Sequence, residues 1–394
     1  MTALLIFSVV LMVAILLSEL SDRSVLSTAV LFLVAGFAVG RSGLNLIPSE
    51  PHDPTIQIVA ELALCSVLFT DGMRASIHDI TSAWKLPGRA LLLGLPLTLF
   101  STAFLAHTLA RIPWLSALLV GAILCPTDPV FAAAIVGKKE IPSRLRFLLN
   151  VESGINDGLA LPIVLALLAI VGHGEVAPLR LGGELLWGIA LGVIVPWAIC
   201  WLHRTRLFGI SKPYEPLFAL ALGLLTLSIA ALTHGNIFLA AFAAGVTIVS
   251  VEPDLRDEFH RFGELIAELL KLAALLLFGA MLAPHYFVGI GPSGYAFALL
   301  AVVLARPLAL LISLAGSRLS WRERLTAAWF GPKGFASVIY GFLLLKAGVP
   351  DAEHLFHLLA IVIAISMIAH SSTDVLIARW FIASPEETAS TQNQ

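Results

Sequence analysis

The chain has 394 residues, of which 58% are hydrophobic and only 13% are charged, and its mean hydropathy is +0.94. A soluble globular domain carries about 25% charged residues, so this composition predicts a chain that lies in lipid. The formal net charge of −2 comes without a basic tract, which excludes nucleic acid as an expected partner.

Apolar runs separated by short polar segments fill the sequence from its first residues. A helix needs about 20 apolar residues to cross the hydrocarbon core, and in lipid its backbone must satisfy its own hydrogen bonds. We therefore interpret the runs as membrane helices and count thirteen. They are expected at residues 2–19, 25–41, 55–73, 90–110, 114–137, 147–173, 182–202, 215–234, 236–251, 262–283, 293–316, 323–346 and 354–378.

The distribution of basic residues predicts the orientation of these helices. Of the 24 lysine and arginine residues, 17 lie in the loops after odd-numbered runs, at the run ends beside these loops or at the C-terminal end, and 4 lie in or beside the loops after even-numbered runs. Because cytoplasmic loops carry an excess of basic residues, we expect a multi-pass protein of a bacterial-type inner membrane, with its N-terminus outside and its C-terminus cytoplasmic. Residues 74–89 suit a short amphipathic helix at the interface or a plain loop.

The fifth run contains an aspartate between two prolines, in the sequence Pro126-Thr127-Asp128-Pro129. A charged side chain at the membrane centre costs at least about 2.5 to 3.5 kcal/mol on insertion scales. Two prolines three residues apart also prevent a continuous helical hydrogen-bond ladder. We expect the helix to break there and its freed backbone groups to line a cation site. The alternative is a proline kink in which Thr127 and Asp128 cap the second half-helix.

The sixth run brings a second carboxylate to the same depth. If this helix begins near Phe147, a rise of about 1.5 Å per residue places Asp157 about 15 Å along it, near the bilayer midplane. Asp128 lies ten residues before the basic segment that begins at Lys138, so it reaches the same level. Two carboxylates from adjacent helices predict a site for a hard cation, although Asp157 could instead be a buried, protonated acid with a structural role.

Neutral oxygen atoms accompany these two aspartates. Thr127, Ser153 and Asn156 could each add an oxygen ligand to the bound cation. Ser153 shares a helical face with Asp157, whereas Glu152 points about 140° away from it. We therefore expect Glu152 to serve a different purpose.

The second half of the chain carries matching features. Gly331-Pro332-Lys333-Gly334 places a helix breaker and a cation inside the twelfth run. The fifth and twelfth runs cross the membrane in opposite directions, and two interrupted helices in inverted positions indicate a secondary transporter built from inverted repeats. Arg306, inside the eleventh run, needs a buried anion, and Glu152 is the acid that remains for a structural ion pair.

Together these motifs resemble the monovalent cation/proton antiporter superfamily, in its NhaP and sodium/proton exchanger branch. The resemblance rests on Thr127-Asp128-Pro129, on Glu152-Ser153 followed by Asn156-Asp157, on Ala305-Arg306 and on the segment from Gly331 to Gly334. It implies an all-α polytopic membrane protein with about thirteen helices in inverted repeats and two broken, crossing helices.

The resemblance also implies a homodimer with a division of labour between its helices. Residues 1–89 would hold dimerisation helices, 90–173 core helices, 174–284 a linker and further dimerisation helices, 285–383 core helices, and 384–394 a short cytoplasmic tail. It implies that Asp157 binds the cation or protons, with Thr127 and Asp128 lining the site, and that Arg306 pairs with Glu152. Lys333 departs from the branch, which has arginine there, and lysine keeps the charge without the bidentate fork.

These residues predict a transporter without an enzymatic activity or a cofactor. The expected reaction exchanges Na⁺, with K⁺ or Li⁺ as further candidates, for protons. It should be electroneutral, because Asn156 cannot titrate beside Asp157. One alternative is sodium-coupled symport of an organic anion on a related inverted-repeat fold. Another is an intramembrane aspartyl protease using Asp128 and Asp157, although its Gly-x-Gly-Asp segment is absent because Asn156 replaces the glycine.

Overall fold

The computed structural model describes residues 2–17, 28–41, 43–47, 53–74, 85–128, 141–173, 178–205, 209–282 and 284–381. Within these ranges the chain is all-helical, and every one of the thirteen predicted runs contains a helix. Among the described residues, seven helices are long and apolar enough to cross a membrane, and five further apolar helices have 10 to 17 residues. The predicted fold class is confirmed, whereas the expected segment at 74–89 and the tail at 384–394 lie largely or wholly outside the described residues.

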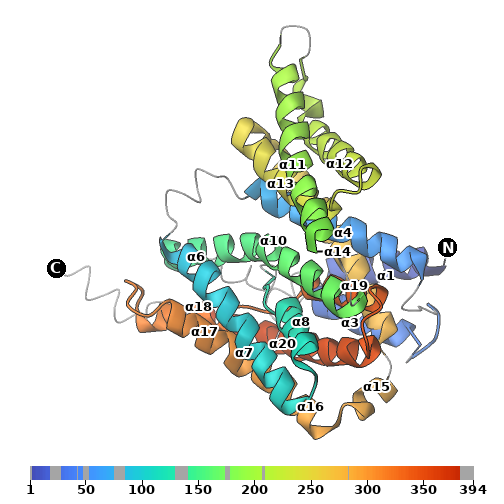
Figure 1. Cartoon of the computed structure of the whole chain (residues 1–394), viewed down its shortest axis with the longest axis vertical. Coiled ribbons are helices and arrows are strands. Elements are labelled where there is room, and N and C mark those ends of the chain that lie inside the picture. Colours follow the sequence, from blue (N-terminus) through green and yellow to red (C-terminus); the bar gives the residue numbers. More distant parts are fainter. Residues whose placement is uncertain are drawn as a thin grey trace.

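One group of helices packs around α14, which contacts α3, α4 and α12. In Figure 1 its members α11, α12 and α13 occupy the top of the view. The helices of this first group are α1 (Thr2–Leu16), α3 (Thr28–Val39), α4 (Pro54–Arg74), α11 (Pro178–His203), α12 (Glu215–Leu232), α13 (Ile237–Val251) and α14 (Asp254–Met281).

Glycines allow these helices to approach one another closely. A Cβ atom on Gly36 of α3 would lie 2.1 Å from the carbonyl oxygen of Leu276 on α14, and one on Gly72 of α4 would lie 2.3 Å from the carbonyl oxygen of Phe242 on α13. Helices in lipid gain much of their stability from such close backbone packing between small residues.

The second group lies in the lower part of Figure 1 and holds the interrupted helices. Its members are α6 (Lys85–Arg89), η1 (Ala90–Gly94), α7 (Leu95–Leu109), α8 (Trp114–Leu124), α10 (Ser143–His173), α16 (Gly291–Leu300), η4 (Ala301–Ala305), α17 (Arg306–Ser313), α18 (Trp321–Trp329), α19 (Phe335–Lys346) and α20 (Ala352–Ala378). The short α15 (Pro284–Gly289) precedes α16, and single 3₁₀ turns cover Lys212–Tyr214 and Arg379–Phe381. Helices α4, α13 and α14 of the first group contact α10 or α19 of the second.

The fourth and eleventh runs share a feature that the sequence analysis did not predict. Each contains a five-residue π-helical segment, η1 and η4, followed two residues later by a proline, Pro96 or Pro307. Proline removes a backbone donor and clashes with the carbonyl group four residues earlier, which in each case lies inside the π segment. A wider turn relieves that clash, and π segments often mark functional sites. In the eleventh run the segment ends directly before Arg306.

Candidate cation site

The helix of the fifth predicted run ends, and that of the twelfth run is interrupted, where the sequence predicts breaks, and these two points meet. Helix α8 ends at Leu124, and α18 and α19 are separated by the non-helical residues 330–334. The Asp128 N–H donates to the Pro332 carbonyl oxygen at 3.0 Å, and the Ser337 hydroxyl donates to the Ile123 carbonyl oxygen at 2.7 Å. The predicted second half of the fifth run begins at Pro129 and lies outside the described residues.

The carboxylate of Asp128 caps the helix that follows the other interruption. Its Oδ2 accepts a hydrogen bond of 3.1 Å from the backbone N–H of Phe335, the first residue of α19. A helix N-terminus stabilises a negative charge through its free N–H groups and its dipole. A Cβ atom on Gly334 would lie 2.4 Å from the Asp128 Cβ, so only glycine permits this approach. Asp128 is therefore fixed at this point through a hydrogen bond to the N-terminus of α19.

On α10, Asn156 and Asp157 bring side-chain oxygens to the crossing. Asn156 Nδ2 donates to Thr127 Oγ1 at 2.6 Å, which joins two predicted site residues. The Oδ1 atoms of Asn156 and Asp157 are buried and have no hydrogen-bond partner among the described residues. Asp157 is 4% exposed, and Asn156 is 1% exposed. Buried polar atoms are rarely left without a partner because the lost hydration is not replaced. These two oxygens suit a cation ligand set.

The remaining predicted site residues are also buried in this region. Ser153 on α10 is 5% exposed. Lys333 is in the interruption, where its backbone N–H donates to Ser366 Oγ at 2.8 Å, while its Nζ has no partner within the part of the chain that the structure describes.

Two charged residues that the sequence analysis did not assign to the site lie beside it. Asp71, near the end of α4, is 3% exposed and its charge acts on both Asp128 and Asp157. Lys271 on α14 places its Nζ 3.8 Å from Asp128 Oδ1. Asp71 comes three residues before Arg74, and its Oδ1 lies 3.4 Å from the Arg74 Nη1. In sequence it therefore looks like an interfacial acid at the end of an apolar run.

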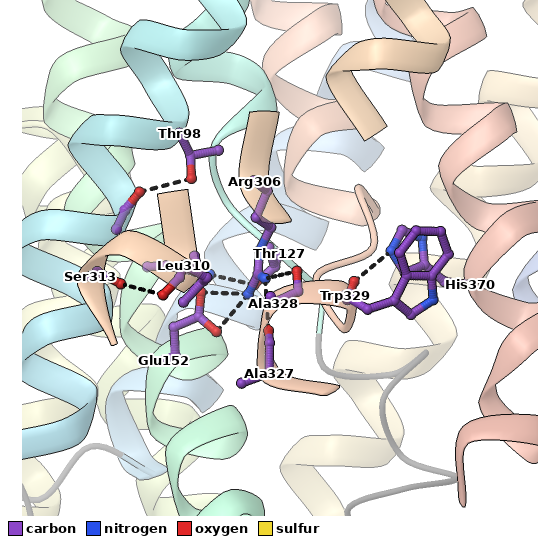
Figure 2. A network of polar contacts seen from close by, with 12 residues as sticks. Thr98, Thr127, Glu152, Arg306, Leu310, Ser313, Ala327, Ala328, Trp329 and His370 are labelled. Atoms are coloured by element: carbon purple, nitrogen blue, oxygen red, sulfur yellow. Dashed lines mark hydrogen bonds and ion pairs between the residues drawn. The ribbon is translucent and has the colours of Figure 1, made fainter. Parts of the chain in front are cut away.

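Glu152 and Arg306 form a separate, fully buried ion pair. The Arg306 Nη2 contacts both carboxylate oxygens of Glu152 at 2.7 Å, and its Nη1 donates to the carbonyl oxygens of Ala327 and Ala328 at 3.1 Å (Figure 2). Those two carbonyl groups belong to the last turn of α18. The pair therefore connects α10 and α17 to the helix end at the second interruption.

The opposite side of that helix end is held by α20. The Nε2 of His370 lies 2.9 Å from the Trp329 carbonyl oxygen, and the His370 ring stacks on the Trp329 side chain with centroids 5.1 Å apart (Figure 2). The Trp329 Nε1 also donates to Thr373 Oγ1 at 2.8 Å. Arginine on one side and histidine on the other thus fix the point at which α18 ends.

The ligand types limit what the site can hold. Across the described ranges, no three side chains of histidine, cysteine, aspartate and glutamate converge as they do around a tightly bound metal ion. Aspartate, asparagine and threonine oxygens are hard ligands that suit alkali cations and protons. The arrangement therefore fits a weakly held, exchangeable ion.

Comparisons with known proteins identify a family and relatives for this chain. The family model described as "Sodium/hydrogen exchanger, transmembrane" matches residues 6–380. The K(+)/H(+) antiporter NhaP2 of Shewanella sp. strain MR-4 is 26% identical over 374 residues, covering 93% of this chain and 65% of that protein. The K(+)/H(+) antiporter NhaP of Alkalimonas amylolytica is 24% identical over 395 residues, covering 99% and 68%. The chain therefore spans slightly less than two thirds of the length of the Shewanella relative.

A solved structure shares the fold over nearly its whole length. The sodium proton antiporter MjNhaP1 from Methanocaldococcus jannaschii, at pH 8, superposes with a TM-score of 0.80. The match covers 97% of this chain and 99% of that chain at 19% sequence identity. At this identity the likeness establishes the fold alone.

Proposed function

The chain belongs to the sodium/hydrogen exchanger family, and on that premise we propose that it exchanges a monovalent cation for protons across a membrane. The observation that carries the proposal is the pair of buried oxygens on Asn156 and Asp157, which lack a partner among the described residues. They lie beside the end of α8 and the break between α18 and α19. A bound cation gives these oxygens the electrostatic partner that they lack. A proton on Asp157 instead removes the negative charge, which is the most costly group to bury without a partner.

Asp157 is the proposed carrier. It holds either a cation or a proton, and only these two neutralised states cross between the two sides of the membrane, because an uncompensated charge in the barrier is costly. Thr127, Asp128, Ser153 and Asn156 supply the remaining ligands. Competition between cation and proton at one carboxylate is sufficient to couple the two fluxes.

The exchange is proposed to be electroneutral. Asn156 cannot titrate, and Glu152 is paired with Arg306 at 2.7 Å, so neither acts as a second proton carrier. The Asp128 carboxylate is engaged by the first N–H of α19 and lies beside Lys271, so it is not the proposed proton carrier. One cation then replaces one proton in each cycle.

We propose that the protein is a homodimer in which one helix group forms the dimer contact and the other moves and carries the site. Residues 1–89 and 174–284 form the dimerisation part, and residues 90–173 and 285–383 form the part that moves and carries the crossing. The packing of the described helices into these two groups supports the division except at α6 (Lys85–Arg89), which packs against η1 and α10 of the second group. The basic loops favour an N-terminus outside and a C-terminus in the cytoplasm of a bacterial-type inner membrane.

The transported cation is proposed to be Na⁺ or K⁺. The structural neighbour is named as a sodium proton antiporter, and the Shewanella relative is named as a K(+)/H(+) antiporter. Li⁺ is the third candidate because its small radius suits carboxylate oxygens. Selectivity among them depends on sub-ångström differences in ligand spacing.

Proteoliposomes with an enclosed pH-sensitive dye test the proposal. The vesicles are prepared with an acidic interior. External addition of NaCl, KCl or LiCl should then change the internal pH for at least one salt, whereas choline chloride should not change it. The Asp157→Asn protein should respond to none. Absence of a response to all three salts at several pH values would contradict antiport, and sodium-dependent binding of an organic anion would favour symport instead.

A further inference from the structure

Lys271 connects the two helix groups through a charge contact at the crossing. It lies on α14 of the first group and is 8% exposed, and its Nζ is 3.8 Å from Oδ1 of Asp128 in the second group. Hydrogen bonds between nitrogen and oxygen rarely exceed 3.2 Å, so this is a charge contact without a direct hydrogen bond. At this distance the ammonium group balances the charge of Asp128. Because no hydrogen bond joins them, it can move away without breaking one.

A second acid offers the same ammonium group another position. Oε2 of Glu268, three residues earlier on α14, lies 3.4 Å from the Lys271 Nζ. The Glu268 side chain is 36% exposed, whereas that of Asp128 is 6% exposed. Lys271 therefore lies between a buried acid at the site and an acid that reaches toward the surface.

Further charged groups near Lys271 lie on α4 and, with Asp157, on α10. Asp71 attracts its charge and Arg74 repels it, and Arg74 is itself paired with Asp71 and with Glu264 of α14. The buried carboxylates Asp71, Asp128 and Asp157 thus share this region with the buried ammonium group of Lys271. A cation that enters adds a further positive charge to it.

We propose that Lys271 is an internal competitor for the transported cation. In the empty site its ammonium group neutralises Asp128. When a cation binds between Asp128 and Asp157, repulsion moves the ammonium group toward Glu268. Lys271 then sets the apparent affinity for the cation, because every binding event must displace it. This inference rests on the proposed function of the same site.

Opposite changes at the two positions test the inference in proteoliposomes. Lys271→Met removes the competitor and should lower the KM for the cation about fivefold, a coupling at the low end of the usual range. Glu268→Gln removes the alternative position and should raise the KM. Lys271→Arg keeps the charge and should restore a KM closer to wild type than Lys271→Met does.

The chain offers a matched control in a second lysine that bridges the same groups. The Lys346 Nζ on α19 lies 2.8 Å from Glu61 Oε1 on α4, and its side chain is 51% exposed. Lys346→Met also removes an ion pair between the groups, but one whose partner is Glu61 and whose lysine side chain is half exposed. Its KM should stay at the wild-type value.

Three outcomes separate the possible failures. An unchanged or higher KM in Lys271→Met, or a lower KM in Glu268→Gln, would overturn the inference while leaving antiport intact. Should Lys271→Met fail to fold, as judged by gel filtration in detergent, the rise expected for Glu268→Gln still decides the question. Wild-type vesicles without any cation-driven proton flux would instead contradict the proposed function.

Discussion

Helix α10 carries two buried polar clusters only four residues apart, and they differ in how fully their atoms are paired. Glu152 has both carboxylate oxygens on Arg306, whose Nη1 is occupied by two backbone carbonyl groups. Asn156 and Asp157 each have an Oδ1 atom without a hydrogen-bond partner in the described part of the chain. Both clusters are nearly inaccessible to solvent.

This difference separates a structural role from a binding role. A buried charge is tolerated when paired and hydrogen-bonded, and such a cluster gains little by admitting another ion. A buried oxygen without a partner carries a cost that an entering cation or proton removes. The first cluster therefore holds the end of α18, whereas the second is the cluster that we propose for the transported ions.

The largest effect is expected at the unpaired cluster. Asp157→Asn should abolish cation-driven proton flux, because asparagine can neither take up a proton nor compensate a cation. The yield and the melting temperature should not fall, since the change removes a buried charge. Flux in proteoliposomes and melting in detergent measure the two properties, and retained flux would exclude Asp157 as the carrier.

The paired cluster should respond in stability instead. Removing one partner, as in Glu152→Gln or Arg306→Met, leaves a buried charge and should cost about 3 to 5 kcal/mol in the free energy of unfolding. The double variant should cost less than the sum of the two single variants. Denaturant unfolding in detergent gives these values, and additive losses would mean that the pair is not coupled.

A smaller loss is expected from the glycine that contacts the pair. A Cβ atom on Gly331 would lie 1.9 Å from the Arg306 Nε, so Gly331→Ala must displace the guanidinium group and should cost about 1 to 3 kcal/mol. Gly154 on α10 is the matched control, because its Cβ would meet no atom within 4 Å. Gly154→Ala should be neutral or stabilising by up to about 1 kcal/mol, and equal losses at both positions would contradict the account.

The smallest expected effect concerns the membrane potential. If Asp157 is the one group that exchanges a cation for a proton, no net charge crosses in a cycle. A potassium potential set with valinomycin should then leave sodium-driven exchange unchanged, although it contributes about 2.3 kcal/mol per charge per 100 mV. A clear acceleration or slowing would indicate a second titrating group, with Asp128 and Lys333 as the first candidates.

The sequence predicts much of the fold because its main signals are local. Thirteen apolar runs and the prolines at positions 126 and 332 are sufficient to predict the helices and their interruptions. The depth of charged residues, counted along the fifth, sixth, eleventh and twelfth runs, also selects Asp128, Asp157, Arg306 and Lys333 as candidates, and the structure places Arg306 against Glu152.

The contributions of α4 and α14 could not be predicted in the same way. Asp71 and Lys271 each have an oppositely charged neighbour three residues away on their own helix. From the sequence alone, a local ion pair is therefore a sufficient explanation for each of these charges. Their proximity to Asp128 arises only when α4 and α14 pack beside the crossing. The π segments likewise depend on how each helix accommodates a proline, and residue type alone does not specify that.

Proton release on cation binding tests the central claim most directly. Purified protein in a weakly buffered detergent solution, near the pH at which Asp157 is half protonated, should release protons when the transported cation is added. The Asp157→Asn variant should release none, while the Glu152→Gln/Arg306→Met double variant should still do so. Equal release from the wild type and the Asp157→Asn variant would contradict the assignment of the carrier to the unpaired cluster.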